Sequence, residues 1–187
     1  MMGIPYIEAY GEGEAQAAYL VENGDAWAVA SQDYDCLLFG AKRVVRNLAI
    51  NSNLGDLEYY NLKRVLDELD INREQLIDMG ILIGTDFSEG LKGVGAKTAL
   101  KLAKKGELEN KLAKLQEESS HDISEVREIF LNHNVNTDYK IRWKKPAKND
   151  IIDFLCEEHG FSQDRVSKAC DKLKNLNSSQ KSLEDWF

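Results

Sequence analysis

The sequence lacks the features of a secreted or membrane-spanning protein. Its three cysteines, Cys36, Cys156 and Cys170, are odd in number and far apart, which argues against a disulfide framework and favours a reducing compartment. No apolar run approaches the roughly 20 residues that a transmembrane helix needs, and the first residues show no signal-peptide pattern. We therefore expect a cytoplasmic protein whose 187 residues form one domain or slightly more.

Positive charge is also scarce, because 24 basic residues stand against 32 acidic ones and the formal net charge is −8. An acidic total argues mildly against broad, non-specific binding of nucleic acid, since phosphates repel carboxylates. The argument is weak, because carboxylates gathered for a function inflate the count. None of the histidines (His121, His133 and His159) forms a ligand-spaced pair with a cysteine, which disfavours zinc.

Hydrophobic patterning predicts an α/β fold. Gly3–Tyr10 is an apolar extended segment, a helix is expected over about 13–22, and Ala26–Ala30 suits a strand buried on both faces. Strand, helix and strand in this order favour a βαβ unit. Further strands are expected at 36–39, 44–48 and 137–143. Helices are expected at about 61–69, 73–84, 96–105, 107–118, 123–131, 151–159 and 163–176.

Five carboxylates follow expected elements of this fold, and we call them the acid set: Glu12, Glu14, Asp33, Asp35 and Asp86. Residues i and i+2 of an extended chain point the same way, and ligands of open α/β sheets bind beyond the carboxyl ends of the strands. Carboxylate oxygens suit Mg²⁺ or Mn²⁺, and two such ions about 4 Å apart can promote phosphodiester hydrolysis. The alternative is that these acids have no metal. The helix dipole then favours the two glutamates at the start of a helix, and Asp33 and Asp35 form a solvated Asx turn.

A glycine–lysine segment precedes and opens the helix expected at 96–105. It consists of Lys92, Gly93, Gly95, Lys97 and Lys101. Glycines let the backbone approach a phosphate closely, and lysines attract the DNA backbone without reading its sequence. The alternative is an ordinary helix with a solvated lysine face after a glycine turn.

The last residues form a C-terminal motif of one glutamine and three large apolar side chains: Gln180, Leu183, Trp186 and Phe187. Leu183 and Trp186 are three residues apart, so one helical turn presents them together. This pattern favours a docking peptide that binds in a groove of a partner. The alternative is a tail that folds back on its own domain.

Five segments carry a resemblance to a known family: Gly3–Glu8, Gly11–Gln16, Ser31–Leu37, Gly84–Phe87 and Gly93–Gly95. In their order and spacing they are similar to the flap endonuclease branch of the XPG structure-specific nuclease family. The resemblance implies a PIN-like α/β core with a mostly parallel sheet over 1–88. It further implies a helical region of the helix–hairpin–helix (H2TH) type over 89–176, and a flexible tail over 177–187.

The resemblance also implies a function, which is the cleavage of 5′ flaps where they join duplex DNA in replication and repair. The acid set matches acids of the family's two-metal Mg²⁺ site, where Mn²⁺ can substitute. Gly93 and Gly95 match the element that grips duplex DNA and holds a monovalent cation such as K⁺. The C-terminal motif resembles the peptide that docks on the sliding clamp, PCNA, and the end at Phe187 is typical of archaeal members.

The family's N-terminal segment, with its further metal-site aspartates and its helical arch, has no match in this sequence. We therefore expect either a nuclease divided between two polypeptides, which Met1 at a joint between elements favours, or a shortened form of a longer chain. In both cases activity is expected to need the N-terminal half. Complementary net charge would speed the assembly of two separate halves.

Two other functions fit the same residues. A non-catalytic module that binds DNA and the clamp would use the lysines and the tail, although carboxylates facing a phosphate backbone would weaken such binding. A gap or bubble nuclease of the same family would differ mainly in the arch. Dependence on Mg²⁺ separates the binding module from both nucleases.

Overall fold

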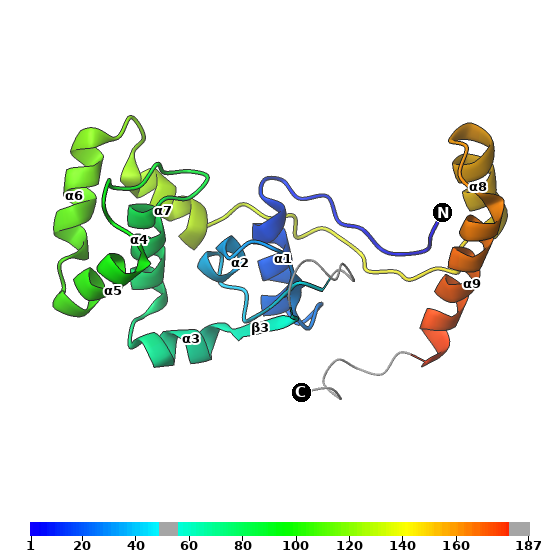
Figure 1. Ribbon diagram of the computed structural model, residues 1–187, viewed down its shortest axis with the longest axis horizontal. Coiled ribbons are helices and arrows are strands. Elements are labelled where there is room, and N and C mark those ends of the chain that lie inside the picture. The colour runs from blue at the N-terminus through cyan, green and yellow to red at the C-terminus, as the bar shows by residue number, and fades with distance from the viewer. Residues whose placement is uncertain (49–55, 180–187) are drawn as a thin grey trace. The chain divides into compact units, whose positions relative to one another are not determined.

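A computed structural model of the chain describes residues 1–48 and 56–179, which divide into two compact units (Figure 1). Unit 2 comprises Ala9–Asn136, and unit 1 combines Met1–Glu8 with the chain from Thr137 onward. The predicted boundary after residue 88 lies inside unit 2. In the described part of the chain, no helix combines the length and the apolar character needed to cross a membrane.

The sheet of unit 2 is small and mixed. Its strands are β1 (Val29–Ala30), β2 (Arg43–Arg46) and β3 (Glu58–Asn61), in the order β1-β2-β3. β1 runs parallel to β2, whereas β3 runs antiparallel to it, so the predicted mostly parallel sheet is half antiparallel over the described residues. Helix α1 (Gly13–Glu22) has the predicted bounds, because its buried face is built from small side chains that pack closely.

Several predicted strands are wrong. Asp35–Leu38 forms a short helix, α2, where a strand was expected at 36–39, and Phe39 N donates to Asp35 O to close its turn. A short apolar run that is buried all round fits a helix and a strand equally well, which explains the error. The segments 3–10 and 137–143 contain no strand. β3 was not predicted at all.

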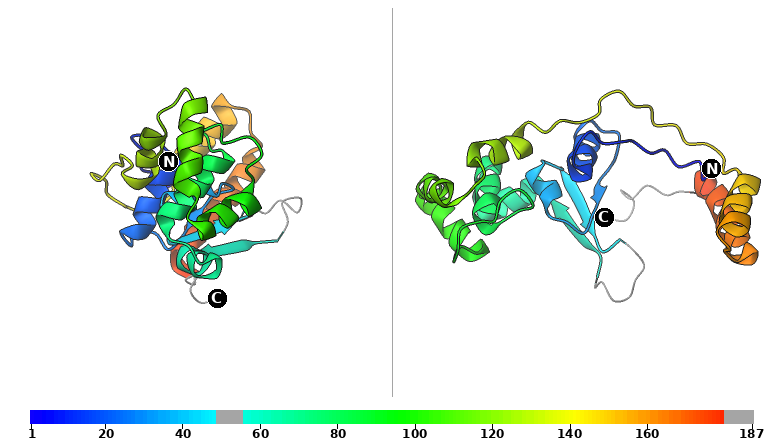
Figure 2. Two further views of the ribbon diagram at one scale, coloured as in Figure 1. Left: turned by 90° about the vertical axis from the view of Figure 1, so that its left-hand side faces the viewer. Right: turned by 90° about the horizontal axis from the view of Figure 1, so that it is seen from above.

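The rest of unit 2 is helical (Figure 2). Its helices are α3 (Leu62–Leu69), α4 (Arg73–Ile83), α5 (Ala96–Lys105), α6 (Leu108–Glu118) and α7 (Ile123–Leu131). α4 packs against α5, α6 and α7. It starts at a capping box in which Asn72 and Gln75 satisfy each other's backbone N–H groups, and its residues Ile77 and Ile81 are fully buried.

One apolar core runs from α1 through the sheet to α7. The rings of Phe39 and Phe130 lie 4.9 Å apart at its centre. The guanidinium of Arg73 donates to the carbonyls of Leu38 and Phe130, and burial lowers its pKa. The core therefore fixes α2, α4 and α7 relative to one another.

A buried glutamine joins the two ends of unit 2. Gln16 in α1 donates through Nε2 to Asn136 O at 2.9 Å and accepts through Oε1 from Asn136 N at 2.7 Å. Both polar atoms of the amide are thus satisfied inside the protein, as a buried polar side chain requires. The contact holds the last residue of unit 2 against its first helix.

Unit 1 contains α8 (Lys148–Ile152), the π-helical turn η1 (Asp153–Glu158) and α9 (Gln163–Ser179). Ile151, Val166 and Cys170 form its small core. Its two chain segments meet where Lys144 N donates to Gly3 O at 2.9 Å. Gly3 has φ +80°, and a Cβ there would lie 2.1 Å from Lys144 O, so only glycine fits this approach.

Candidate functional site

The glutamates of the acid set lie at the start of α1. Glu12 precedes the helix and Glu14 occupies its first turn, but Glu12 makes no side-chain capping hydrogen bond. The helix dipole favours carboxylates at this position, so the placement agrees with both interpretations of the pair. Ser31 Oγ lies 3.3 Å from Glu14 Oε1 and donates to it, which connects α1 to the loop that carries the next two acids.

Asp33 lies between β1 and α2, and Asp35 is the first residue of α2, so both follow the carboxyl end of a strand as predicted. Ser31 Oγ accepts a hydrogen bond from Asp33 N at 3.1 Å, and Asp33 Oδ1 accepts one from Asp35 N at 3.4 Å. The loop is therefore a pair of local turns, and the extended backbone expected for these residues is absent. Asp33 is exposed, whereas Asp35, the first residue of α2, is partly buried.

Asp86 is exposed in the turn that follows α4. Thr85 and Ser88 pair with each other on either side of it, and buried Ser88 Oγ donates to Ile81 O at 3.1 Å. The turn leaves α4 at Gly84, whose φ of +120° lies outside the range open to other residues. The apolar core thus fixes the backbone on which Asp86 stands.

The structure brings the acid set into one electrostatic environment. Burial, followed by the negative charges of Asp33, Asp86, Glu14 and Glu12, raises the pKa of Asp35 from 3.8 to about 6. All four neighbours are carboxylates, so the ionisation of Asp35 adds to a negative charge that a bound cation relieves.

The donor chemistry of the acid set fits Mg²⁺, which prefers carboxylate oxygens. The side-chain positions are less complete. Among the residues that the structure describes, no three His, Cys, Asp or Glu side chains lie close enough together to hold a metal ion. This chain therefore gathers ligands of the right kind without showing a full coordination shell.

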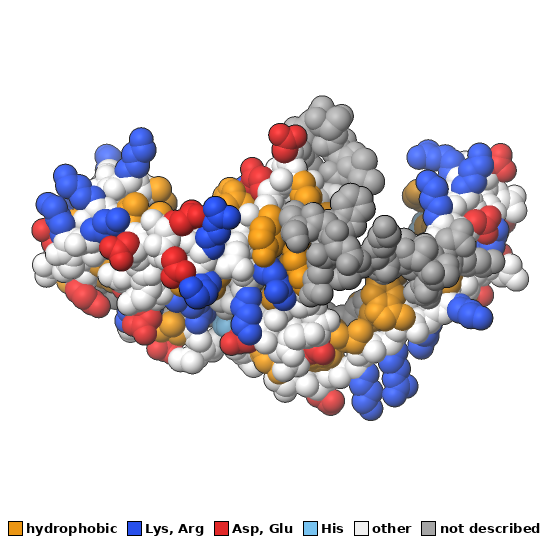
Figure 3. Space-filling model, turned by 90° about the horizontal axis from the view of Figure 1, so that it is seen from below, with side chains coloured by type: hydrophobic (Ala, Val, Ile, Leu, Met, Phe, Trp, Pro, Cys, Tyr) orange, Lys and Arg blue, Asp and Glu red, His pale blue; other side chains and the backbone are white. Residues whose placement is uncertain are grey.

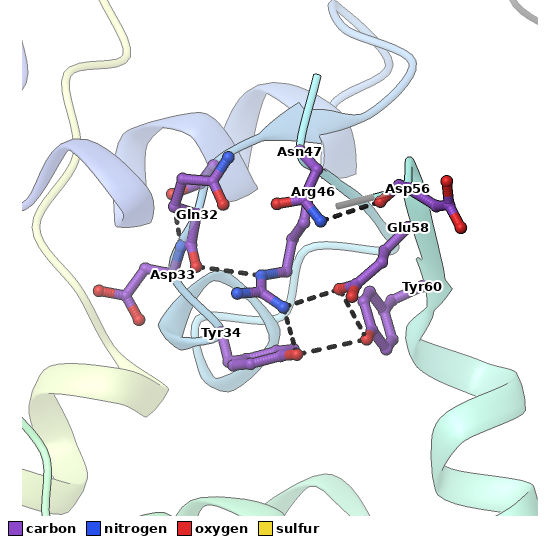
Figure 4. Close-up of polar contacts among 9 residues, drawn as sticks. Gln32, Asp33, Tyr34, Arg46, Asn47, Asp56, Glu58 and Tyr60 are labelled. Atoms are coloured by element: carbon purple, nitrogen blue, oxygen red, sulfur yellow. Dashed lines mark hydrogen bonds and ion pairs between the residues drawn. The ribbon is translucent and has the colours of Figure 1, made fainter. Parts of the chain in front are cut away.

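A network of hydrogen bonds around Arg46, which was not predicted, borders residues 31–35, which we call the aspartate loop (Figure 4). Arg46 ends β2 and donates to Gln32 O, to the hydroxyl of Tyr34 and to the carboxylate of Glu58. Tyr60 on β3 donates to the same carboxylate at 3.0 Å. In the sequence, the only sign of this network is Tyr34, which stands between Asp33 and Asp35. Arg46 lies eleven residues after Asp35, so local spacing does not indicate it.

The glycine–lysine segment is brought together in part. Lys92, Gly93 and Lys101 line a hollow of about 420 Å³ beside α5. Gly93 has φ +85° in the turn that Val94 N closes on Leu91 O, and Gly95 precedes α5. Gly95 and Lys97 do not line the hollow, and the monovalent cation expected at the glycines stays a prediction.

Further lysines line the same hollow: Lys105 at the end of α5, and two that the sequence did not predict, Lys111 and Lys114. The last two come from α6, so this basic surface is formed by two helices. Figure 3 shows Lys and Arg side chains gathered over the end of unit 2 that α5 and α6 form. Glu107 also borders the hollow, and Lys114 pairs with Glu118 at 3.5 Å, which reduces its net positive charge.

A hollow of about 530 Å³ lies beside Glu12 and was not predicted. Phe39 and Phe87 form apolar walls, and α7 contributes Glu128. His133, at its border, packs edge-on against the ring of Phe39, in agreement with its interpretation as a packing residue. The C-terminal motif at 180–187 lies outside the described residues, so clamp docking stays a prediction.

Comparisons with known proteins relate the chain to one family. Residues 3–86 match the XPG I-region. The chain is 55% identical over 188 residues to flap endonuclease 1 of Methanothermobacter thermautotrophicus, covering 100% of this chain and 57% of that protein. The solved structure of flap endonuclease-1 from Methanococcus jannaschii matches with a TM-score of 0.85 at 44% identity, over 95% of this chain and 56% of that chain.

A more distant match is human GEN1 in complex with Holliday junction DNA. Its TM-score is 0.72 at 27% identity, over 97% of this chain and 53% of that chain. The chain thus spans little more than half the length of the relatives that it matches.

Proposed function

We propose that this chain, which belongs to the XPG nuclease family and corresponds to a C-terminal portion of the archaeal flap endonucleases, supplies part of the metal centre and of the DNA grip of a 5′-flap endonuclease. One observation carries the proposal. Burial of Asp35, followed by the negative charges of carboxylates from the loop before α2, from the turn after α4 and from the start of α1, raises the pKa of Asp35 to about 6. A fold gathers like charges in this way at a functional site more often than elsewhere.

In this proposal the acid set holds two Mg²⁺ ions together with carboxylates from the N-terminal portion of the enzyme; Mn²⁺ can replace them. Bound Mg²⁺ supplies a Lewis acid and lowers the pKa of a water molecule. Asp35, which like Glu14 is partly buried, anchors the site from the core side, and the exposed Asp86 closes it from the end of α4. The hydrolysis leaves a 5′-phosphate and a 3′-hydroxyl at the base of the flap.

The lysine hollow binds the phosphate backbone of the downstream duplex in the same proposal. Lys92 and Lys101 on one side and Lys111 on the other present positive charge to this hollow. Such contacts position a duplex and do not read its sequence. This agrees with a substrate that is recognised by its junction.

The N-terminal half completes the enzyme, either as a separate chain or as part of a longer one. The chain spans only 57% of its archaeal relative, and over the described residues β1 pairs with β2 alone. A strand from the other half would cover the open edge of β1, since an unpaired buried edge is costly. We therefore expect this chain to be inactive by itself.

Flap cleavage with Mg²⁺ tests the proposal, using the chain alone and then mixed with the N-terminal half. Cleavage only by the mixture supports it. In the mixture, Asp35→Asn and Asp86→Asn should each lower turnover at least about a thousandfold, or 4 kcal/mol, and leave flap-DNA affinity within about twofold. Asp67→Asn, on exposed α3, is the matched control and should cleave normally. Near-normal cleavage by Asp35→Asn would refute the metal-site assignment.

A second candidate function is a non-catalytic module that binds DNA and the sliding clamp. A basic hollow on helices that carry none of the acid set favours it. If the chain is such a module, it should bind duplex DNA, and neither the chain alone nor its mixture with the N-terminal half should cleave it. It should also bind the clamp, and Phe187→Ala should abolish that binding. A panel of flap, gap and bubble substrates separates the nuclease types.

A further inference from the structure

We propose that Arg46 is a positioning residue that, together with Tyr34, fixes the backbone between Asp33 and Asp35 and thereby sets the spacing of their carboxylates. The inference rests on the proposed function, because it assigns Arg46 a role toward the metal ligands of that site.

The contacts of Arg46 lie on both sides of Asp33. Its Nε donates to the carbonyl of Gln32 at 3.0 Å, just before Asp33 in the chain. Its Nη1 donates to the hydroxyl of Tyr34, just after it, and the guanidinium carbon lies 4.0 Å from the centre of the Tyr34 ring. One planar group from β2 therefore holds the residues that flank the acid (Figure 4).

Few contacts hold the aspartate loop apart from those of Arg46. Gln32, Asp33 and Tyr34 are exposed to solvent, so apolar burial contributes little to fixing their backbone. The turn bonds of the loop, at 3.1 Å and 3.4 Å, both run within residues 31–35. Ser31 N ties the start of the loop to Val45 O on β2 at 3.2 Å, and the contacts of Arg46 tie the residues on either side of Asp33 to the same strand.

The arginine is itself fixed by a second layer. Glu58 on β3 accepts from Arg46 Nη1 at 2.7 Å, and Tyr60 donates to Glu58 at 3.0 Å. The hydroxyl of Tyr60 also lies 3.3 Å from that of Tyr34. Hydrogen bonding to Tyr34, burial and the Glu58 carboxylate raise the pKa of Tyr60 to about 12, so Tyr60 stays protonated. The guanidinium is thus pre-oriented, and its side chain is only 18% exposed.

The arrangement indicates an effect through position. The positive charge of Arg46 is paired with Glu58, whereas the groups that shift the pKa of Asp35 most, besides burial, are carboxylates. The planar fork of arginine reaches a carbonyl and a hydroxyl together, and it stacks on an aromatic ring in a way that lysine cannot. Lysine at this position should therefore keep the charge and lose the function.

The same strand offers a matched control. Arg43, three residues earlier in β2, also places its guanidinium over an aromatic ring, that of Trp27 at 5.0 Å, and donates to a carbonyl, that of Trp27. It carries the same charge and a similar stack without flanking a member of the acid set. Loss of sheet stability should affect both variants, whereas loss of loop position should affect only the Arg46 variant.

Binding of Mn²⁺ to the mixture of this chain with the N-terminal half tests the inference, with each substitution made in this chain and binding measured by the decrease of the free-ion paramagnetic resonance signal. Arg46→Met and Arg46→Lys should each weaken Mn²⁺ binding about tenfold to a hundredfold, as loss of a ligand-orienting contact does at other metal sites. Arg43→Met should stay within about twofold of the unsubstituted chain. Hydrogen exchange of the 31–38 segment should quicken about tenfold in Arg46→Met and stay unchanged in Arg43→Met.

The outcomes separate this inference from the proposed function. If Asp35→Asn binds Mn²⁺ as well as the unsubstituted chain does, or if neither binds it, the metal site itself is refuted and the inference with it. If Asp35→Asn loses binding while Arg46→Met keeps it, only the positioning role is refuted. Equal losses in Arg46→Met and Arg43→Met would also overturn it, since they would show that general sheet stability is responsible. Full rescue by Arg46→Lys would show that charge, and not position, matters.

Discussion

Asp35 and Asp78 are two carboxyl groups of the same unit that the fold treats in opposite ways. Burial raises the pKa of both. Asp78 on α4 is 5% exposed and faces Arg127 of α7, whose Nε lies 2.8 Å from Oδ1 and whose Nη2 donates to Oδ2 at 3.2 Å. Asp35 faces the other members of the acid set.

The difference lies in what compensates each charge. The Asp78 carboxylate joins two core helices, and the arginine that compensates it comes from the fold itself. The Nε–H of Arg127 does not point at Oδ1, so that contact is an ion pair without a hydrogen bond. The charges that raise the pKa of Asp35 are all carboxylates. If the acid set binds a cation, as proposed above, relief of this repulsion contributes to the driving force.

The largest effect on stability is expected when Asp78, like Asp35, is left without a compensating cation. Arg127→Met leaves a buried carboxylate without its cation and should lower the free energy of unfolding by about 3 kcal/mol, since breaking a buried pair from one side is costly. Asp78→Leu combined with Arg127→Met should recover most of the loss. Urea denaturation followed by circular dichroism measures both. A loss below about 0.5 kcal/mol in Arg127→Met alone would contradict the contrast between Asp78 and Asp35.

Removal of the negative charge of Asp35 should stabilise the chain in the absence of metal. The pKa of Asp35 is about 6 in the folded state against 3.8, so the folded state binds more protons in this window and stability falls as the pH rises through it. Asp35→Asn removes the penalty and should raise the free energy of unfolding by about 1 to 2 kcal/mol at pH 7.5. The full shift is discounted because Asp35 is partly exposed.

At pH 3 the same substitution should change stability little, since Asp35 is then protonated in both states. Denaturation of both chains in chelator at the two pH values gives the comparison. Equal gains at pH 3 and pH 7.5 would mean that repulsion among the carboxylates is not the cause.

Addition of Mg²⁺ should reduce the difference in the free energy of unfolding between the unsubstituted chain and Asp35→Asn. At a Mg²⁺ concentration about five times the dissociation constant, the unsubstituted chain gains about 1 kcal/mol of stability, and Asp35→Asn gains almost none. Thermal unfolding in chelator and in Mg²⁺ measures this, with Ca²⁺ as an ionic-strength control of different preferred geometry. An equal gain in both chains would indicate general screening of surface charge.

The smallest effect is expected at exposed ion pairs. Arg64 and Glu68 on α3 pair at 2.6 Å, a shorter distance than in the Asp78 pair, but their side chains are 80% and 62% exposed. Glu68→Ala should change the free energy of unfolding by less than about 0.5 kcal/mol, because water solvates both charges well. A cost close to that of Arg127→Met would show that burial does not set the difference.

Sequence reasoning predicted the long helices well and the strands poorly. α1, α5 and α7 have the predicted bounds because their apolar spacing extends over several turns. α2 was mistaken for a strand because four buried residues carry no period. β3 was missed because its Glu-Tyr-Tyr-Asn sequence lacks an apolar face. Its Tyr59 instead stacks on Trp27, and its Tyr60 packs edge-on against Tyr34.

At the site, the sequence predicted which acids to consider but not what positions them. The acid set follows strand and helix ends that patterning can locate, so its members could be named from the sequence. Arg46, Lys111 and Lys114 reach their sites through tertiary packing, which no local spacing encodes. The assignment of the acid set to metal binding remains a prediction.

The bond between Lys144 and Gly3 bears on the order in which the chain folds. These residues are about 140 positions apart, and joining them in an unfolded chain would cost about 4 kcal/mol of loop-closure entropy. Once unit 2 has formed, Gln16 holds Asn136, and only about 20 residues remain in the loop, which lowers the cost by about 2 kcal/mol. All residues of unit 2 are synthesised before Lys144, so Gly3 stays without this hydrogen-bond partner until synthesis has passed residue 144.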